Sequence, residues 1–299
     1  MDFTHSILAF IAKHIRHGAG LKHISSIFFF LLCIPFPIPS ASAQCPLENT
    51  AFLPGENLDY QLYFNWKFIW LKAGTANLRI DAARYNGQDI YRAYLLTRGN
   101  KRTDRFFIMR DTIVSYLTPR LEPLFYRKGA REGKRYYIDE VWYSYPGDGC
   151  VQLRQQYTNP AGEVRRYERT VNDCVTDMLS MLIRARSFDP TLYHEGQKIR
   201  FKMADGDRVS DETLVFRGKK NFKMDQTGIT YRCLVFSSVW YDDNNKEREV
   251  ITFYITDDAN HVPVRLDMYL RFGTAKAFLS GATTLRNPQS SIVKKKTKN

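Results

Sequence analysis

The sequence predicts a mainly β protein, an antiparallel curved sheet or incomplete barrel with one central α-helix. Three observations lead to this prediction. From Phe52 to Val171, short segments alternate apolar and polar residues and are separated by turn residues, which is the pattern of half-buried strands. Only residues 174–188 repeat apolar residues at helical spacing, and the strand pattern resumes after Gly196 without a low-complexity linker. We therefore expect a single domain over residues 44–285.

Residues 1–43 have the three parts of a secretory signal peptide. A leader with three basic residues precedes the apolar segment Ile27–Ile38, and the small residues 41–43 form a cleavage site. The apolar segment is shorter than the roughly 20 residues of a spanning helix and contains prolines, so an uncleaved anchor is the weaker interpretation. Gln44 then begins the mature chain, and its side chain fits lipidation of Cys45 poorly. We expect an exported protein in the periplasm of a Gram-negative bacterium, with association with the outer membrane left open.

The chain is basic, but its charge is not concentrated in one segment. The formal net charge is +13, and the signal peptide removes three basic residues and one acidic residue to leave about +11. The only compact basic run, Lys294-Lys295-Lys296, lies in a segment that we expect to be a basic disordered tail, residues 286–299. No nucleic-acid-binding motif is present, so a lipid or another anionic envelope component is the expected partner. A basic surface that only maintains solubility is the alternative.

The first strands follow directly from the alternation. Ala76, Leu78, Ile80 and Ala82 share one face, and the dipeptide Asn86-Gly87 predicts a hairpin turn into residues 90–96. We expect further strands at residues 57–64, 105–116, 121–128, 135–145, 151–157 and 164–171.

The helix is predicted over residues 174–188. Its apolar residues recur three and four positions apart, and they are Val175, Met178, Leu179, Leu182 and Ile183. Asn172 or Asp173 can cap its start, and Pro190 follows its end.

The pattern of the C-terminal half predicts an antiparallel β-meander. Residues 231–240, 250–256 and 262–272 alternate apolar and polar side chains, and acidic and asparagine-rich turns separate them. In the last of these strands Val264 and Leu266 share the apolar face, whereas Arg265 lies on the polar face.

Four cysteines remain after removal of the signal peptide, and an even number in an exported protein predicts two disulfides. Folding residues 151–157 onto 164–171 brings Cys150 opposite roughly residue 172, so we expect a Cys150–Cys174 bond. Cys45 and Cys233 are the pair left over. Because no close Cys/His cluster is present, we expect no metal site.

The candidate ligand-binding residues are Met178, Asp177, Arg184 and Arg265. Met178 lies on the apolar face of the helix, where it can line a ligand site or fill the core. Asp177, Ser180 and Arg184 are three and four residues apart, so they can orient an anion or form a surface salt bridge. We assign no catalytic residue and no cofactor, because no catalytic signature is present and His194 and His261 have no nucleophile at a telling spacing.

Several blocks of the sequence occur in a characteristic order. They are Phe52–Tyr60 (FLPGENLDY), Trp70–Ala76 (WLKAGTA), Asp111 with Ser115, Asp177–Arg184 (DMLSMLIR), and Asp257 with Val262–Arg265 and Gly273. Together they resemble the domain of unknown function 3108 family, a group of exported bacterial proteins, over about residues 52–285. The resemblance implies no activity, because the family has none to carry over.

Three functional hypotheses follow. The first is a non-enzymatic periplasmic protein that binds an apolar or amphipathic envelope component, since a helix and a ligand can cover the apolar face of a one-sided sheet. The second is an envelope assembly scaffold that binds another protein through a strand edge or the basic face. The third, and weakest, is a glycan-acting enzyme with Asp111, Asp177 or Glu56 as acid or base.

Overall fold

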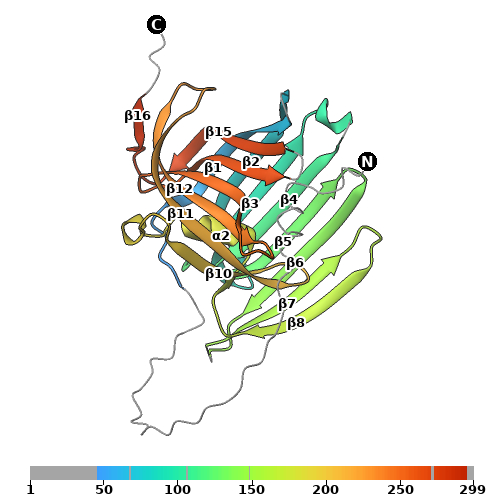
Figure 1. Ribbon diagram of the computed structural model, residues 1–299. Helices are drawn as coiled ribbons and strands as arrows, with labels where there is room; N and C mark the ends of the chain where they lie inside the picture. The colour runs from blue at the N-terminus through green and yellow to red at the C-terminus, as the bar shows by residue number, and fades with distance from the viewer. Residues whose placement is uncertain (1–45, 67–68, 106, 148, 271–272, 295–299) are drawn as a thin grey trace, which may run out of the picture.

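The computed structural model describes residues 46–66, 69–105, 107–147, 149–270 and 273–294 (Figure 1). These residues form one sheet of 16 strands, a helix α2 and two short 3-10 helices. The strands of the first half are β1 Phe52–Trp66, β2 Ile69–Tyr85, β3 Gln88–Gly99, β4 Met109–Leu117, β5 Pro123–Glu132, β6 Arg135–Ser144, β7 Val151–Thr158 and β8 Val164–Val171.

After a short strand, the chain forms its helix and then returns to strands. These elements are β9 Val175–Thr176, α2 Met178–Ala185, β10 Lys198–Ala204, β11 Val209–Lys223, β12 Thr230–Tyr241, β13 Glu247–Thr256, β14 Pro263–Leu270, β15 Gly273–Leu285 and β16 Ile292–Lys294. The 3-10 helices are η1 Thr103–Arg105 and η2 Pro190–Leu192. The predicted signal peptide, residues 1–43, lies outside the described residues.

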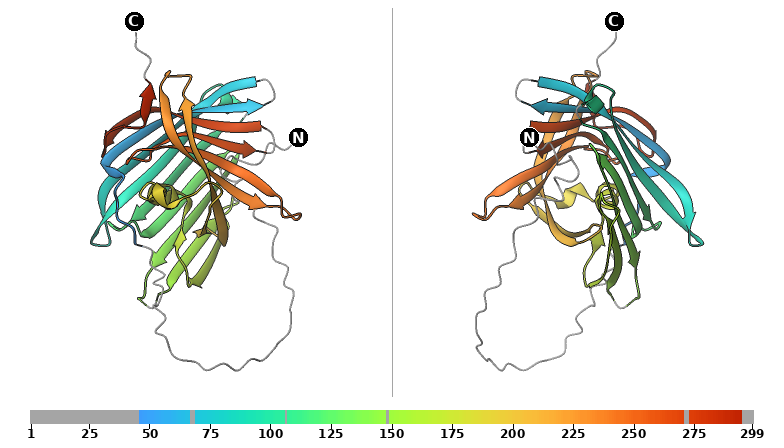
Figure 2. Two further views of the ribbon diagram at one scale, coloured as in Figure 1. Left: turned by 60° about the vertical axis from the view of Figure 1, so that its left-hand side comes forward. Right: turned by 90° about the vertical axis from the view of Figure 1, so that its right-hand side faces the viewer.

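The sheet is a curved, barrel-like wall with a seam. Its order runs from β8 through β1 to β15 and on to β9, because β1 pairs with both β2 and β15. Figure 2 shows this wall curved around α2, with the early strands on one side of the helix and the late strands on the other. The prediction of a curved sheet or incomplete barrel around a helix is confirmed. The sheet is mixed rather than purely antiparallel, because β9 and β10 pair in parallel.

The predicted alternation places side chains inside and outside the barrel. In β4, Met109, Asp111, Ile113, Ser115 and Leu117 are all buried, and the residues between them are more exposed. The Asn86-Gly87 turn between β2 and β3 also forms, with both residues at positive φ (50° and 81°), as a two-residue hairpin requires.

Helix α2 is shorter than predicted at both ends. Residues 175 and 176 form β9 on the edge of β10, so the helix begins only after Asp177. The Asp177 side chain accepts a hydrogen bond from the Ser180 N–H at 2.8 Å, and Asp177 is therefore the N-cap instead of Asn172 or Asp173. No helix among the described residues is long and apolar enough to cross a membrane.

One end of the barrel is tightly packed, and we call it the packed end. It contains fully buried side chains from the first half of β1, from the second half of β2, and from the end of β4 and the turn after it. These are Phe52, Leu58, Ile80, Leu117 and Leu121. In β2 the chain runs toward this end, and in β1 it runs away from it. The interior beyond Leu58 on β1 is different, because there the wall encloses a cavity.

The predicted disordered tail from residue 286 is wrong for residues 286–294. The strand β16 pairs with β12, and Ser291 just before it is fully buried. The Ser291 hydroxyl donates to Asp258 Oδ2 at 2.6 Å, and Asp258 Oδ1 accepts from the Thr256 hydroxyl at 3.0 Å. These bonds fix the segment against the packed end. Residues 295–299 lie outside the described residues.

Both predicted disulfides are wrong. The register of the β7–β8 hairpin is as expected, with Val151 opposite Val171, but Cys150 carries a thiol that donates to Asn172 Oδ1 at 2.9 Å. Cys174 lies beyond this ladder, because β8 ends at Val171 and the chain leaves to form β9. Cys233 is a buried thiol inside β12, and burial raises its pKa to about 12. Cys45 lies outside the described residues.

The seam is bridged by side chains rather than by a strand pair. The turn between β10 and β11 lies against β7 and β8. Gln155 Nε2 on β7 donates to Arg208 O at 2.7 Å, and Arg169 Nη2 on β8 donates to Asp207 O at 2.8 Å. These bonds hold the two edges of the wall together without closing the ladder.

Candidate ligand cavity

An apolar cavity of ≈ 230 Å³ lies between α2 and the inner face of the sheet. Its wall includes residues from β1, β2, β3 and β4 on one side and from β10 to β15 on the other. Almost all of the inward-facing side chains are aliphatic or aromatic, among them Leu62, Leu78, Phe201, Phe236, Phe253, Leu266 and Met268. The barrel thus places an apolar space at its centre, and the strand alternation supplies the lining.

Helix α2 covers this space with one face. Met178, Met181, Leu182 and Ala185 line the cavity, and Ile183 packs in the core instead. The three- and four-residue spacing of these side chains is the helical apolar stripe that the sequence showed. Met178 is therefore placed at the predicted site, and its role in ligand binding stays a prediction.

Asp111 is the most unusual residue of the cavity wall. It lies on the inner face of β4, its exposed fraction is 3%, and its Oδ2 accepts from the Thr97 hydroxyl at 3.2 Å. No hydrogen bond of normal geometry reaches its Oδ1 from the described residues. Burial raises the pKa of Asp111 to about 7, and Glu132 adds to the shift, although Lys128, the Thr97 bond and the main-chain N–H of Arg131 oppose it.

A second carboxylate, Glu212 on β11, lines the opposite wall. Its exposed fraction is 8%, and it accepts a hydrogen bond from the Ser210 hydroxyl at 2.8 Å. Burial raises the pKa of Glu212, while the Ser210 bond and the Arg208 charge lower it. Unlike Asp111, Glu212 therefore already has a hydrogen-bond donor.

Charged side chains continue behind Asp111 along the inner face of β5 and β6. Lys128, Glu132 and Asp139 are all buried. Lys128 Nζ lies 5.0 Å from the centre of the Tyr137 ring, and the Tyr137 hydroxyl donates to Glu132 Oε1 at 2.8 Å. Burial and the neighbouring Asp205 carboxylate raise the pKa of Asp139 well above its usual range. Around Asp111 the buried groups are thus mainly acidic.

Asp177, a predicted ligand-binding residue, is a structural residue of the helix start. It is fully buried, and besides the Ser180 N–H it accepts bonds from the Ser180 hydroxyl at 2.6 Å and the Ser115 hydroxyl at 2.7 Å. Burial raises the pKa of Asp177, and these bonds lower it. They attach α2 to β4, and Asp177 is not among the residues of the cavity wall.

Arg184 and Arg265 also lie outside the cavity wall. Arg184 is buried, and its Nη1 donates to Leu121 O at 2.5 Å, which joins α2 to the packed end. Arg265 faces outward from β14, where its Nε donates to Asp267 Oδ1 at 2.7 Å. Its guanidinium lies 4.7 Å from the Tyr254 ring centre and 4.9 Å from that of Phe222. The Asp177, Ser180 and Arg184 series is thus neither an exposed salt bridge nor part of the cavity.

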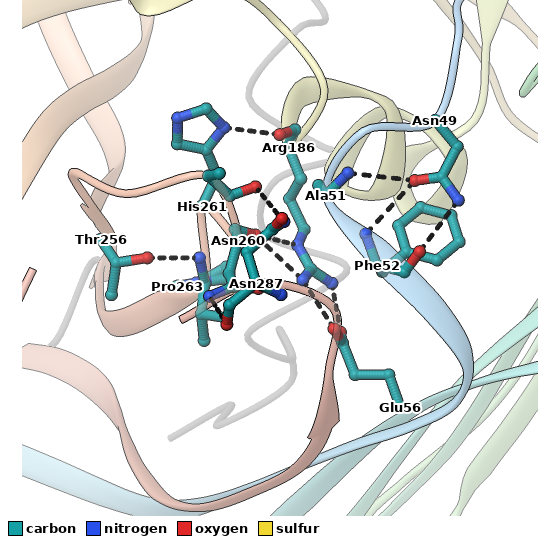
Figure 3. Close-up of polar contacts among 12 residues, drawn as sticks. Asn49, Ala51, Phe52, Glu56, Arg186, Thr256, Asn260, His261, Pro263 and Asn287 are labelled. Atoms are coloured by element: carbon teal, nitrogen blue, oxygen red, sulfur yellow. Dashed lines mark hydrogen bonds and ion pairs between the residues drawn. The ribbon is translucent and has the colours of Figure 1, made fainter. Parts of the chain in front are cut away.

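A buried ion pair closes the end of α2 against β1 (Figure 3). Both guanidinium Nη atoms of Arg186 donate to Glu56, at 2.5 and 2.9 Å, and Arg186 Nε donates to Asn260 O at 3.1 Å. The exposed fractions of the two side chains are 0% and 1%. His261 lines the cavity beside this pair, with its Nδ1 2.6 Å from Arg186 O.

The positions of the carboxylates bear on the enzyme hypothesis. Glu56 is held by Arg186 and Asp177 by the helix start, so of the three predicted acids only Asp111 faces the cavity. Sequence reasoning missed Glu212 and did not assign Asp111 to a binding site. The signal for Asp111 was its place in β4, where a carboxylate occupies an inward position between Met109 and Ile113.

The fold and the cavity define a class: a β-barrel-like protein whose central apolar space is covered by a single helix. The sequence matches the family described as Protein of unknown function (DUF3108) over residues 59–280, and the chain belongs to this family. The family resemblance of the sequence blocks is confirmed. No curated protein matches the chain in sequence.

Two solved structures are similar to this one. A beta-barrel-like protein of the domain of unknown function DUF1849 from Brucella abortus has a TM-score of 0.50 and 10% identity, covering 78% of this chain and 99% of its own. A Bacteroides fragilis protein with a YmcC-like fold has a TM-score of 0.32 and 10% identity, covering 80% and 100%. At this identity the Brucella structure supports the barrel-like fold alone.

Proposed function

We propose that the protein is a non-enzymatic periplasmic protein that binds an apolar or amphipathic envelope component, a lipid-like molecule, in the cavity beneath α2. The observation that carries this proposal is the cavity itself. Its lining comes from ten strands and the helix, and nearly every inward position in that part of the barrel is apolar. The secretory signal pattern of residues 1–43 supports a place in the envelope.

The energetics of the cavity support an occupant. The cavity is partly open, so its apolar wall is in contact with water unless a ligand covers it. The packed end demonstrates that this chain can fill its interior where the interior has only a structural role. An apolar ligand recovers the lost packing and hydrophobic free energy and stabilises the folded protein by mass action.

The first test is mass spectrometry of an organic extract from the mature protein, purified from the periplasm without detergent. We expect one recurring lipid or amphipathic molecule at near one per protein. Protein that is repeatedly recovered without any such molecule, and that binds none from an envelope lipid extract, would contradict the proposal.

A matched pair of variants locates the binding site. Met178 lines the cavity, whereas Leu192 is 71% exposed on η2 and is not in the cavity wall. Met178→Lys introduces a charge into the apolar space, so we expect loss of the bound molecule, while Leu192→Lys retains it. Circular dichroism of both variants separates loss of binding from loss of folding. Retention of the molecule by folded Met178→Lys would place the ligand elsewhere.

One observation favours the second candidate, an envelope assembly scaffold. Among the described residues, the terminal strand β8 pairs with β7 alone. Its residues are mostly exposed, including Val164 at 43% and the basic Arg165 and Arg166. An open basic strand edge can add a strand from another protein. Cross-linking in intact cells tests this candidate. A scaffold predicts an envelope protein that cross-links to the wild type, dissociates at high salt and is lost with Arg165→Glu; a binding protein predicts no such dependence.

A further inference from the structure

We propose that the open end of the barrel docks on an anionic lipid membrane through a basic rim, a band of exposed basic residues on the β3–β4 and β5–β6 connections with exposed aromatic residues beside it. The open end is the end opposite the packed end, where β1 ends and β2 begins. This inference rests on the proposed function, because a protein that binds a lipid-like molecule has to reach the membrane that holds it.

The basic rim consists of six exposed side chains at the ends of β3 and β5, at the start of β6 and in the connections between these strands. They are Arg98, Lys101, Arg102, Arg131, Lys134 and Arg135. None of the six forms an ion pair within the part of the chain that the structure describes. The main-chain N–H of Gly133 donates to Ile108 O at 2.8 Å, so the two connections lie next to each other.

Few negative charges oppose the rim within its own segments. Residues 98–110 and 131–136 contain two acidic residues, Asp104 and Glu132. Asp104 pairs with Arg110, and Glu132 is buried. An anionic partner that approaches this part of the open end therefore meets unpaired cations and no unpaired exposed carboxylate.

Three arginines lie directly opposite one another across adjacent strands. Arg98 on β3 pairs with Arg110 on β4, and Arg110 pairs with Arg131 on β5. Direct partners share a face of the sheet, and like charges in such pairs are destabilising. Asp104 compensates Arg110, with its Oδ1 2.9 Å from Arg110 Nη1. An anionic surface over the row compensates the other two charges as well.

The exposed aromatic residues lie at the same end of the barrel. Within the described part of the chain these are Trp70, Tyr136 and Tyr269, with exposed fractions of 54%, 48% and 36%. Trp70 and Tyr136 follow the first residues of β2 and β6, and Tyr269 precedes the last residue of β14. Tyr136 also continues the arginine row, because it lies opposite Arg131. Exposed Trp and Tyr beside basic residues are typical of the interface between water and a bilayer.

A membrane is the anionic partner that the position of the rim favours. The cavity wall reaches the open end, since Met109 is the first residue of β4 and Ala73 follows exposed Lys72 on β2. The turns 205–208 and 242–246 of the late strands, also at this end, each contain two aspartates. An anionic lipid surface therefore attracts one side of the open end, which orients the protein with the cavity toward the membrane.

The experiment measures sedimentation of the mature protein with vesicles. One kind contains phosphatidylcholine alone, and the other also contains about one third of phosphatidylglycerol. We expect the protein to bind the anionic vesicles at least about tenfold more tightly than the neutral ones. This binding should be lost in about 1 M salt, where charge interactions are screened within about 3 Å.

Two double charge reversals test which surface binds. Lys101→Glu with Arg102→Glu reverses two charges of the basic rim. The matched control is Lys220→Glu with Lys223→Glu, which makes the same change in net charge on exposed residues of β11 near the packed end. We expect the rim variant to bind anionic vesicles at least about tenfold more weakly and the control to bind like the wild type. Circular dichroism checks that both variants fold.

Trp70→Phe tests which side chain contacts the lipid. On anionic vesicles that contain brominated phosphatidylcholine, the wild type should lose part of its tryptophan fluorescence, because a bromine quenches an indole that it approaches. Trp70→Phe should lose less of its fluorescence. The matched control is Trp142→Phe, since Trp142 on β6 is only partly exposed and lies beneath Arg154, 4.4 Å from its ring centre. This control should keep the quenched component.

The outcomes separate this inference from the proposed function. Wild-type protein that does not bind the anionic vesicles overturns the inference, while a lipid in the organic extract still supports the proposed function. Equal weakening by both charge reversals would mean that net charge alone drives binding, and it also overturns docking through the rim. Equal quenching in the wild type and Trp70→Phe would place the lipid contact elsewhere. An acidic envelope protein that cross-links to the rim, without vesicle binding, would replace the membrane as the partner.

Discussion

The packed end and the cavity are built from the same strands, and they treat buried polar groups in opposite ways. At the packed end, Arg186 donates twice to Glu56 and twice to Asn260 O, and Asp258 accepts from Thr256 and Ser291. In the cavity wall, Asp111 Oδ1 receives no hydrogen bond of normal geometry from the described residues. Along β1, the interior changes from closely packed at Leu58 to hollow at Leu62, which faces the cavity.

This contrast indicates what each region does. Buried polar groups are normally bonded, and an unbonded one reduces stability without contributing to the fold. A chain that completes an Arg–Glu–Asn network at one end has the means to pair Asp111 at the other, for example with a hydroxyl like that of Ser210 beside Glu212. The packed end therefore has the polar groups of a fully bonded core, whereas the cavity leaves free volume and a buried carboxylate oxygen without a donor of normal geometry among the described residues.

The largest expected effect is at the packed end. Arg186→Ala leaves the Glu56 carboxylate buried and unpaired, so we expect the free energy of unfolding to fall by about 3–5 kcal/mol. Urea denaturation followed by circular dichroism measures it. The control is Arg79→Ala, because Arg79 pairs with Asp81 at the surface, and we expect little change there.

A second substitution tests the cause of that loss. In Arg186→Ala, adding Glu56→Leu removes the unpaired charge, and we expect it to restore part of the stability. If the double variant were no more stable than Arg186→Ala, the loss would come from the packing of Arg186 on Phe52 rather than from the isolated carboxylate.

The next prediction compares the stability lost on truncating two leucines of β1. Leu58 and Leu62 both face inward from β1, but Leu58 packs in the core and Leu62 lines the cavity. Leu58→Ala leaves a hole in packed surroundings and should cost about 3–4 kcal/mol, whereas Leu62→Ala enlarges an existing space and should cost about 1–2 kcal/mol. Urea denaturation of the delipidated variants measures both values.

Measuring ligand binding to Leu58→Ala and Leu62→Ala sharpens this comparison. A ligand that contacts Leu62 should bind more weakly to Leu62→Ala and with unchanged affinity to Leu58→Ala, provided that the latter is folded. Equal losses of stability in the two delipidated variants would contradict the distinction between a packed end and a hollow centre.

Much of the fold follows from local patterns in the sequence. The alternation predicted most strands, the Asn86-Gly87 turn fixed a register, and the apolar stripe of α2 was visible as residues three and four apart. These features depend on neighbours in sequence. The parallel β9–β10 pair does not, because it depends on where the chain returns after the helix, and it shortened the helix that the sequence predicted.

The candidate site was less predictable, because its contacts join residues that are distant in the sequence. Met178 could be placed because the helix face is a local property, but Arg184 and Arg265 were assigned from their charge, and their partners are the Leu121 carbonyl and outward-facing Asp267. The predicted cysteine pairing was also wrong, since the correct register of the β7–β8 hairpin does not determine the path of the chain after Val171, where Cys174 lies. Asp111 became informative only when its missing donor could be seen.

The most specific expected change in stability is the pH dependence caused by Asp111. Its pKa is about 7 in the folded protein and ordinarily 3.8, so between these values the folded state binds more protons than the unfolded state. The unfolding free energy of the wild type therefore falls as pH rises from about 4 to about 7, by at most about 4 kcal/mol for this group. The penalty is complete above pH 7 and absent below pH 4.

Asp111→Asn does not titrate, so it lacks this contribution. We expect the variant to be more stable than the wild type above about pH 7, by roughly 2 kcal/mol because the buried amide keeps part of the desolvation cost, and to lose this advantage as pH falls toward about 4. Urea denaturation of both delipidated proteins across this range gives the difference, in which the contributions of Glu212, Asp139 and Asp177 cancel. A difference that does not vary with pH would mean that water already reaches Asp111 Oδ1. The cavity wall would then hold no unsatisfied carboxylate oxygen, and the contrast with the packed end would reduce to one of volume alone.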